Sequence, residues 1–347
     1  MSADVDADVL VVGGGPVGLA TAIEARLAGL SVVIVEPRVG IIDKACGEGL
    51  MPGALAALAR LGVDPQGHAI TGISYRDALR HVDHAFRGGP GRGVRRTVLH
   101  GALLDRCASL GAERVVARVT RVTQSPTAVE AAGVRARWLL ACDGLHSPVR
   151  RLVGLDAAGP RWSGRPPVRR FGLRRHFAVA PWTGMVEVHW GPGAEAYVTP
   201  VARTEVGVAL LGPGGVDFST ALATFPSLAR RLDGGEATTS VLGAGPLRQR
   251  ARARTTGRVR LVGDAAGYVD ALTGEGLRVG LAQARAAIAY LDDGAAYERA
   301  WRAATRDDRV LTTAVTAWAT SPARRSVVPV ARAAPWLFGA VVERLAH

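Results

Sequence analysis

The sequence predicts an α/β fold, α+β overall, in which a domain built on a parallel sheet receives an inserted antiparallel sheet. Three observations support this prediction. Apolar runs at residues 9–12 and 31–35 flank a helical stretch, which is the order of a βαβ unit. From about 161 to 250, apolar and polar residues alternate between Gly and Pro breaks, as is typical of antiparallel strands. A buried-strand pattern returns at 258–262.

The remaining elements are placed by the same periodicities. Helices are expected at 54–61, at 99–110 and from about 277 to 291, and strands at 115–122, 128–134 and 137–141. Residues 68–95 are less regular and are interpreted as short strands. The chain after Ala295 is expected to be mostly helical.

Composition limits the class of protein. The chain has 347 residues, 48% hydrophobic and 21% charged, which excludes a wholly disordered protein. The sequence has no run of about 18 uncharged apolar residues, so a membrane-spanning helix is not expected. Peripheral association with a membrane stays open. The N-terminus lacks the basic region of a secretory signal. Three scattered cysteines without a C-x-x-C spacing give no disulfide framework, so a cytoplasmic location is expected.

The formal charge of +13 does not indicate nucleic-acid binding. Lys44 is the only lysine, and the arginines occur in ones and twos without interleaved aromatic residues, so no nucleic-acid partner is expected. A basic field can still attract anionic cofactors. His81 and His84 have no evident third ligand nearby, and we expect no metal site. Oligomeric state stays open.

A glycine-rich loop follows the first strand. Gly13, Gly15 and Gly18 form the pattern G-x-G-x-x-G, in which the first glycine permits a tight turn, the second lets the backbone approach a pyrophosphate, and the third lets the helix pack closely. The helix N-terminus would face the phosphates. Glu36, at the end of the second strand, is placed to bind an adenosine ribose. The pattern predicts a dinucleotide site without separating FAD from NAD.

Two later motifs favour FAD over NAD, because they resemble motifs of a known family. Residues 138–150, around Asp143-Gly144, resemble the Asp-Gly motif of flavoprotein monooxygenases, and residues 257–267, with Gly263-Asp264, resemble their Gly-Asp motif. Arg96 and Leu99 are similar to the family's Arg-x-x-Leu helix start. Nearly the whole chain thus resembles the glutathione-reductase-type FAD superfamily, in the p-hydroxybenzoate hydroxylase and geranylgeranyl reductase branch.

This resemblance implies an FAD-binding Rossmann-like domain with an inserted substrate domain. The implied division is an FAD domain at 1–75, 96–160 and 251–300, a substrate domain at 76–95 and 161–250, and a C-terminal helical segment at 301–347. The implied cofactor contacts are Gly13, Gly15, Pro16, Val17, Gly18, Glu36, Arg38, Lys44, Arg96, Asp143, Gly263, Asp264, Gly274, Gly276 and Leu277. Lys44 is equally consistent with a surface residue, and Asp143 with a structural turn.

The reaction class depends on two departures from the aromatic hydroxylases. Residues 272–276 (LTGEG) and the cysteine-glycine loop at 44–49 look more like geranylgeranyl reductases. This favours NAD(P)H-dependent reduction of a double bond in a bulky apolar molecule, isoprenoid- or polyketide-like, of secondary metabolism. The alternative is a monooxygenase that hydroxylates or epoxidises through a flavin C4a-hydroperoxide. A third hypothesis is a non-catalytic flavin- or metabolite-binding protein, or one that binds a membrane surface through residues 333–342.

Candidate reactive groups lie in the same segments. Acid–base work at the flavin could fall to Cys46, Glu48 or Glu275. Aromatic residues in the second sheet are candidate walls of a substrate cavity, with core packing as the alternative: Trp162, Trp182, Trp190 and Tyr197.

Overall fold

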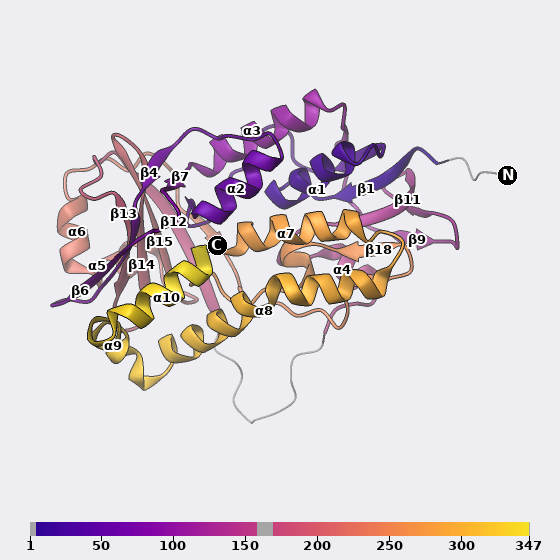
Figure 1. Ribbon diagram of the computed structural model, residues 1–347. Coiled ribbons are helices and arrows are strands. Elements are labelled where there is room, and N and C mark those ends of the chain that lie inside the picture. Colours follow the sequence, from indigo (N-terminus) through magenta and orange to yellow (C-terminus); the bar gives the residue numbers. More distant parts are fainter. Residues whose placement is uncertain (1–4, 158–168, 347) are drawn as a thin grey trace.

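Two large sheets form the two halves of the protein, and helices from the last part of the chain run along both (Figure 1). The computed structural model describes residues 5–157 and 169–346. The predicted α/β class with a second, largely antiparallel sheet is confirmed. Trp162 lies outside the described residues.

The first sheet has a parallel centre and antiparallel margins. Five parallel strands run in the order β18, β11, β1, β2, β8, which are Val259–Leu261, Val134–Ala141, Ala7–Val12, Val32–Val35 and Glu113–Val115. At one edge, β17 (Thr255–Thr256) pairs antiparallel with β18. Beside β11, β10 (Val129–Ala131) pairs antiparallel with β11 and, on its other side, with β9 (Val122–Gln124). Strands β1 and β2 are buried almost throughout, as expected for parallel strands covered on both faces.

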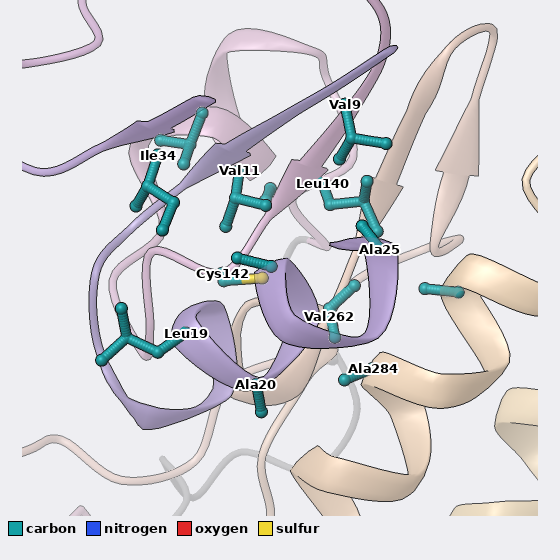
Figure 2. Close-up of a cluster of buried hydrophobic side chains, with 14 of the residues drawn as sticks. Val9, Val11, Leu19, Ala20, Ala25, Ile34, Leu140, Cys142, Val262 and Ala284 are labelled. Atoms are coloured by element: carbon teal, nitrogen blue, oxygen red, sulfur yellow. The ribbon is translucent and has the colours of Figure 1, made fainter. Parts of the chain in front are cut away.

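Helices α1 (Pro16–Leu27) and α7 (Gly276–Ala289) pack against each other beside this sheet (Figure 2). Figure 2 shows Val9 and Val11 of β1 facing α1, with Ala20 of α1 beside Ala284 of α7. Small residues allow this approach: a Cβ on Gly280 would lie 2.5 Å from Val17 Cγ2. The core therefore fixes the starts of both helices next to the ends of the strands.

The second sheet carries the opposite half of the molecule. Its order is β16, β12, β15, β14, β13, β5, β6, which are Leu242–Ala244, Arg170–Phe177, Glu205–Pro213, Glu195–Ala202, Met185–Trp190, Gly72–Arg76 and His81–Ala85. All neighbours are antiparallel except β13 and β5, which are parallel.

Shorter elements complete the structure. The short strands predicted for residues 68–95 are confirmed, and two of them, β4 (His68–Ile70) and β7 (Gly91–Gly93), form a small sheet with β3 (Gly49–Leu50). The other helices are α2 (Pro52–Arg60), α3 (Arg96–Ser109), α4 (Pro148–Leu152), α5 (Phe218–Ala223), α6 (Pro226–Leu232), α8 (Gly294–Ala319), α9 (Val327–Ala333) and α10 (Pro335–Ala346), with 3-10 turns η1 (Gly263–Ala266) and η2 (Pro322–Ser326). Among the helices of residues 5–157 and 169–346, none combines the length and apolarity that a membrane crossing requires.

The predicted strand at 115–122 is wrong. The chain instead forms β8, which ends at Val115, and β9, which begins at Val122. Within the described residues, β8 pairs only with β2, and the last pair of this ladder joins Val35 and Val115, so the ladder ends at Val115. Val116 is accordingly exposed.

Buried ion pairs join the second sheet to the segment before α7. Arg170 on β12 binds Glu195 on β14 at 2.6 Å and Asp270 at 2.9 Å. Arg324 of η2 binds the other oxygen of Glu195 at 2.7 Å. Because each buried charge has a partner, this cluster can hold the two halves and the C-terminal helices in one arrangement.

Candidate functional site

A cavity of about 360 Å³ lies between the first sheet and the second. Its floor is made by the start of α1, the segment 44–51 and the segment 271–277, and its walls by the second sheet. Helices α8, α9 and α10 supply apolar residues to it, including Trp318, Leu337 and Phe338. The predicted cofactor residues Pro16, Val17, Lys44, Arg96, Asp264, Gly274, Gly276 and Leu277 line this cavity.

The glycine loop has the close contacts that its spacing predicts. Gly13 has a φ of 106°, and a Cβ there would lie 2.5 Å from the Cys142 carbonyl oxygen. A Cβ on Gly18 would lie 1.8 Å from the Gly13 carbonyl oxygen, so α1 packs directly on the turn. Gly15 faces open space and caps α1 without a side-chain acceptor. The first N–H groups of α1 are therefore available to a phosphate.

Glu36 is buried beside this loop. Its Oε2 accepts a hydrogen bond from the Gly14 N–H at 2.8 Å, and its Oε1 accepts one from Arg38 Nε at 2.7 Å. Burial opposes ionisation, but these hydrogen bonds outweigh it and hold the pKa of Glu36 below its ordinary value. The carboxylate is thus ready to accept hydrogen bonds from a ribose.

Sequence reasoning missed His100, which supports the same loop. This buried residue of α3 accepts a hydrogen bond at Nδ1 from the Ile42 N–H, 3.3 Å away, so its Nε2 can donate to the Gly14 carbonyl at 2.8 Å. Burial lowers the pKa of His100, which favours this neutral form. The signal available in the sequence was its position one turn after Arg96, on the same face of the helix.

Several buried polar atoms near the cavity lack a hydrogen-bond partner, and Arg174 Nε is one of them. Arg96 Nε and Asp143 Oδ1 are both buried without a hydrogen bond. The other oxygen of Asp143 accepts a hydrogen bond from the Val149 N–H at 2.9 Å and so holds the start of α4. A guanidinium whose buried Nε is an unused donor, lining the same cavity as the free N-terminus of α1, matches the needs of a diphosphate.

Lys44, Arg96 and Asp264 form the charged part of the cavity floor. A Cβ on Gly144 would lie 3.6 Å from Lys44 Nζ, so the lysine lies against the Asp-Gly turn. Burial raises the pKa of Asp264, and the positive charges of Lys44 and Arg96 partly offset it. Gly263 anchors this turn to α7, because its N–H donates to Gln283 Oε1 at 2.8 Å. The Gly-Asp turn, the lysine and the arginine thus meet at one place.

Glu48 is part of a buried network that the sequence did not reveal. It has a φ of 58°, and its Oε1 accepts the Arg96 N–H at 2.7 Å. Its Oε2 lies 2.5 Å from Nε2 of His176 on β12. Arg174, which also binds Asp43, donates to His176 Nδ1 at 2.8 Å. Because a guanidinium only donates, Nδ1 accepts and Nε2 carries the hydrogen that bonds Glu48.

Glu275 is a buried carboxyl at the start of α7 that also lines the cavity. Burial raises its pKa to about 7, although Arg278 Nε, 2.7 Å from Oε2, acts in the opposite direction. Such a group can hold or release a proton near neutral pH. Cys46 lines the cavity too, and burial raises the pKa of its thiol, which therefore stays neutral.

The candidate aromatic walls occupy different places. Tyr197 lines the cavity and donates to the Leu272 carbonyl at 2.7 Å. Trp190 does not line it but packs on Tyr75, which does, with ring centroids 5.3 Å apart. Trp182 packs in the cluster of α5 and α6, away from the cavity. Tyr197 and Tyr75, the latter not considered from sequence, are therefore the aromatic side chains of this sheet that face the cavity.

These residues fit an FAD molecule. The glycine loop and Arg96 match the diphosphate, Glu36 the ribose, and the start of α7 the end of a flavin that carries negative charge when reduced. Among residues 5–157 and 169–346, no group of three or more His, Cys, Asp or Glu side chains is placed to hold a metal ion.

Comparison with known proteins agrees with this geometry. The sequence model described as "FAD binding domain" matches residues 6–86, which include the glycine loop and Glu36. In the sequence of its first 86 residues and in its fold, the chain is similar to FAD-dependent enzymes of the p-hydroxybenzoate hydroxylase superfamily. The resemblance inferred from the three motifs is thus confirmed, and this FAD-dependent oxidoreductase has the fold that the superfamily implies.

Relatives of this oxidoreductase include both reductases and monooxygenases. It is 28% identical over 332 residues to the menaquinone reductase of Mycobacterium tuberculosis, covering 84% of this chain and 78% of that one. It is 31% identical over 191 residues to the para-nitrophenol 4-monooxygenase of a Pseudomonas species, covering 45% of each. The flavin-dependent brominase Bmp2 shares its fold, with a TM-score of 0.81 at 16% identity over 98% of this chain and 93% of that one.

Proposed function

We propose that this protein is an FAD-dependent reductase that uses NAD(P)H to reduce a double bond in a bulky, apolar, isoprenoid- or polyketide-like molecule. One observation carries the proposal: the charged lining residues of the cavity come from the segments around the first sheet and from β12, and none of the lining residues from the C-terminal helices is charged. Its charged lining residues are Lys44, Glu48, Arg96, Arg174, Asp264 and Glu275, whereas every lining residue from α8, α9 and α10 is apolar. A long hydrocarbon group fits such a chamber better than a small phenol does.

The proposed reaction needs two electrons and two protons delivered to the substrate. FAD supplies the electron chemistry when bound, taking two electrons and a proton from NAD(P)H and passing two electrons and a proton to one carbon of the double bond. The second carbon then needs a proton from the protein. Glu275, with a pKa of about 7, can donate it and regain it from solvent.

The other candidate groups have different parts in this proposal. Both oxygens of Glu48 are held, one by the Arg96 N–H and one by His176, so Glu48 positions the loop 44–49 rather than moving a proton. Cys46 is a neutral thiol in the wall and shapes the chamber. The coverage of this chain by the menaquinone reductases, 84–85%, supports a reductase more than the shorter match to the monooxygenase.

A monooxygenase is the second candidate. The match to para-nitrophenol 4-monooxygenase includes 31% identity over 191 residues, and the Asp143-Gly144 turn is intact beside the cavity. A closed, apolar chamber would also exclude water from an oxygenation reaction. The two candidates differ in whether molecular oxygen enters the product.

The deciding experiment is turnover with and without oxygen. Purified holoprotein would be incubated anaerobically with NADPH or NADH and with menaquinone or geranylgeranyl diphosphate as probe substrates, and products would be identified by mass spectrometry. A gain of two hydrogen atoms without oxygen supports the reductase. Strict dependence on oxygen, with label from ¹⁸O₂ in the product, would overturn it in favour of the monooxygenase.

A further inference from the structure

Apolar side chains are exposed where α9 meets α10. We propose that residues 327–342, here called the C-terminal elbow, dock on the surface of an anionic lipid bilayer and admit an apolar substrate from it to the cavity. This inference rests on the proposed function for the nature of the substrate. It concerns the route by which that substrate reaches the cavity.

The outer side of the C-terminal elbow is more apolar than an ordinary surface. Trp336 is 75% exposed, Leu337 46% and Val330 42%. Ala333, Pro335 and Ala340, which separate these side chains along the chain, are exposed as well. Single exposed apolar residues are common, but a grouped patch that includes a tryptophan marks a binding surface. Tryptophan in particular favours the boundary between water and lipid.

The same segment forms the wall of the cavity. Val330, Ala334 and Leu337 line the cavity, and Val330 and Leu337 are also exposed to solvent. At these positions one layer of side chains separates the chamber from the outside. An apolar molecule that left a bilayer here would pass from lipid into the cavity with little contact with water.

The charged residues around the C-terminal elbow favour an anionic lipid surface over a protein partner of mixed charge. Residues 322–342 contain Arg324, Arg325 and Arg332 and no acidic residue. Arg324 is held by Glu195, but Arg325 and Arg332 are exposed and have no ion-pair partner in the part of the chain that the structure describes. Two free arginines beside an exposed tryptophan complement anionic headgroups and the acyl layer below them.

The inner side of α10 is already fixed, which leaves its outer side for docking. A Cβ on Gly339 would lie 2.6 Å from His84 Nδ1, so α10 lies directly on β6. His84 Nε2 and Glu343 Oε1 are 2.7 Å apart. With 7 and 12 residues, α9 and α10 are too short to cross a bilayer, for which about 20 are needed. They can lie in its interface instead.

Flotation with lipid vesicles tests this inference. The full-length holoprotein would be mixed with phosphatidylcholine vesicles with or without 30 mol-percent phosphatidylglycerol (about one lipid in three), and the bound fraction measured. We expect binding to the anionic vesicles and an about tenfold weaker partition for Trp336→Ser, because one large apolar side chain loses its burial. Arg332→Glu should weaken binding to anionic vesicles only. Val116→Ser, an exposed valine near the first sheet, is the matched control and should bind like the wild type.

The outcomes separate this inference from the proposed function. Wild-type protein that stays with the soluble fraction, or Trp336→Ser that floats like wild type, would overturn the docking inference even if anaerobic turnover succeeds. Light scattering provides a second test. A dimer that Trp336→Ser converts to a monomer would show that a second copy of the chain covers the C-terminal elbow, which also contradicts lipid docking.

Discussion

His176 on β12 donates a hydrogen bond from Nε2 to Glu48 Oε2, 2.5 Å away, and so ties the second sheet to the loop that precedes β3. Glu48 in turn accepts the N–H of Arg96 at the start of α3. The bond therefore connects the wall of the cavity with the arginine that faces the proposed diphosphate site.

Glu48→Gln should destabilise the protein without changing its shape. A Gln side chain can still accept the Arg96 N–H, but its amide nitrogen would then face the N–H of His176, which leaves two donors opposed. Loss of a buried hydrogen bond of a charged group costs about 1.5–3 kcal/mol in the free energy of unfolding, which urea titration of the apoprotein measures. Glu113→Gln, on the exposed strand β8, is the control and should change it by less than about 0.5 kcal/mol. An equal effect of both substitutions would contradict this account of the network.

Arg96→Met should weaken FAD binding by about 10- to 100-fold, because the unpartnered guanidinium Nε in the cavity would no longer be offered to the diphosphate. Retention of FAD after ultrafiltration, followed by visible absorbance, measures the loss. The control is Arg92→Met, whose guanidinium binds Asp64 and the Pro65 carbonyl outside the cavity. If Arg96→Met keeps wild-type affinity, the diphosphate does not lie at this arginine.

Two glycines of the same loop should respond differently to alanine. Gly18→Ala places a Cβ 1.8 Å from the Gly13 carbonyl and should lower the thermal midpoint of the apoprotein by several degrees, or prevent folding. Gly15→Ala meets no protein atom within 4 Å, so its apoprotein should melt like wild type while its affinity for FAD falls. Calorimetry with and without FAD distinguishes the two. Normal FAD affinity in folded Gly15→Ala would remove Gly15 from the cofactor site.

The rate of substrate reduction should fall as pH rises through about 7, because Glu275 has a pKa of about 7 and must be protonated to donate. Glu275→Gln should lower the rate by about 10²- to 10⁴-fold and abolish this dependence. The contribution of Glu275 to the free energy of unfolding should also fall as the pH rises. The native state binds a proton more strongly than the unfolded state between about pH 4.5 and 7, so this group's contribution to stability declines over that range.

Arg278→Met provides a sharper test of the same group. Arg278 lowers the pKa of Glu275, so its removal should move the midpoint of the pH–rate profile upward by about one pH unit. Arg285→Met, further along α7, serves as the control and should leave the midpoint in place. A midpoint that does not respond to Arg278→Met would assign the titration to another residue.

Local constraints explain which features the sequence predicted. The loop 13–18 could be predicted from the sequence because its structure depends on residues close together in the chain. These give a turn at Gly13, a helix start at Pro16 and a close contact at Gly18. The apolar strands of the first sheet are readable because burial on both faces leaves a continuous apolar run. The helix α7 is readable because its buried residues, such as Gly280, Ala284 and Ala287, recur at helical spacing.

Contacts between distant segments explain what was missed. Glu48 and His176 are 128 positions apart, and His176 stands in a strand that reads as ordinary alternation. Arg170 and Arg174 each stand next to a second arginine in the sequence, as surface arginines often do, yet both are buried and bind acidic partners from other segments. Trp190 and Tyr197 both belong to the second sheet, and only their positions in the sheet decide that Tyr197 faces the cavity.

The one-sided distribution of charge in the cavity has a consequence for chemical selectivity. A substrate made of repeating units offers several equivalent double bonds, and no charged lining residue from α8, α9 or α10 distinguishes one unit from the next. How far the chain threads inward would then decide which bond reaches Glu275. Under the proposed function, the depth of the cavity would therefore select the bond that is reduced. A larger side chain at the apolar end would change which bond is hydrogenated rather than whether hydrogenation occurs.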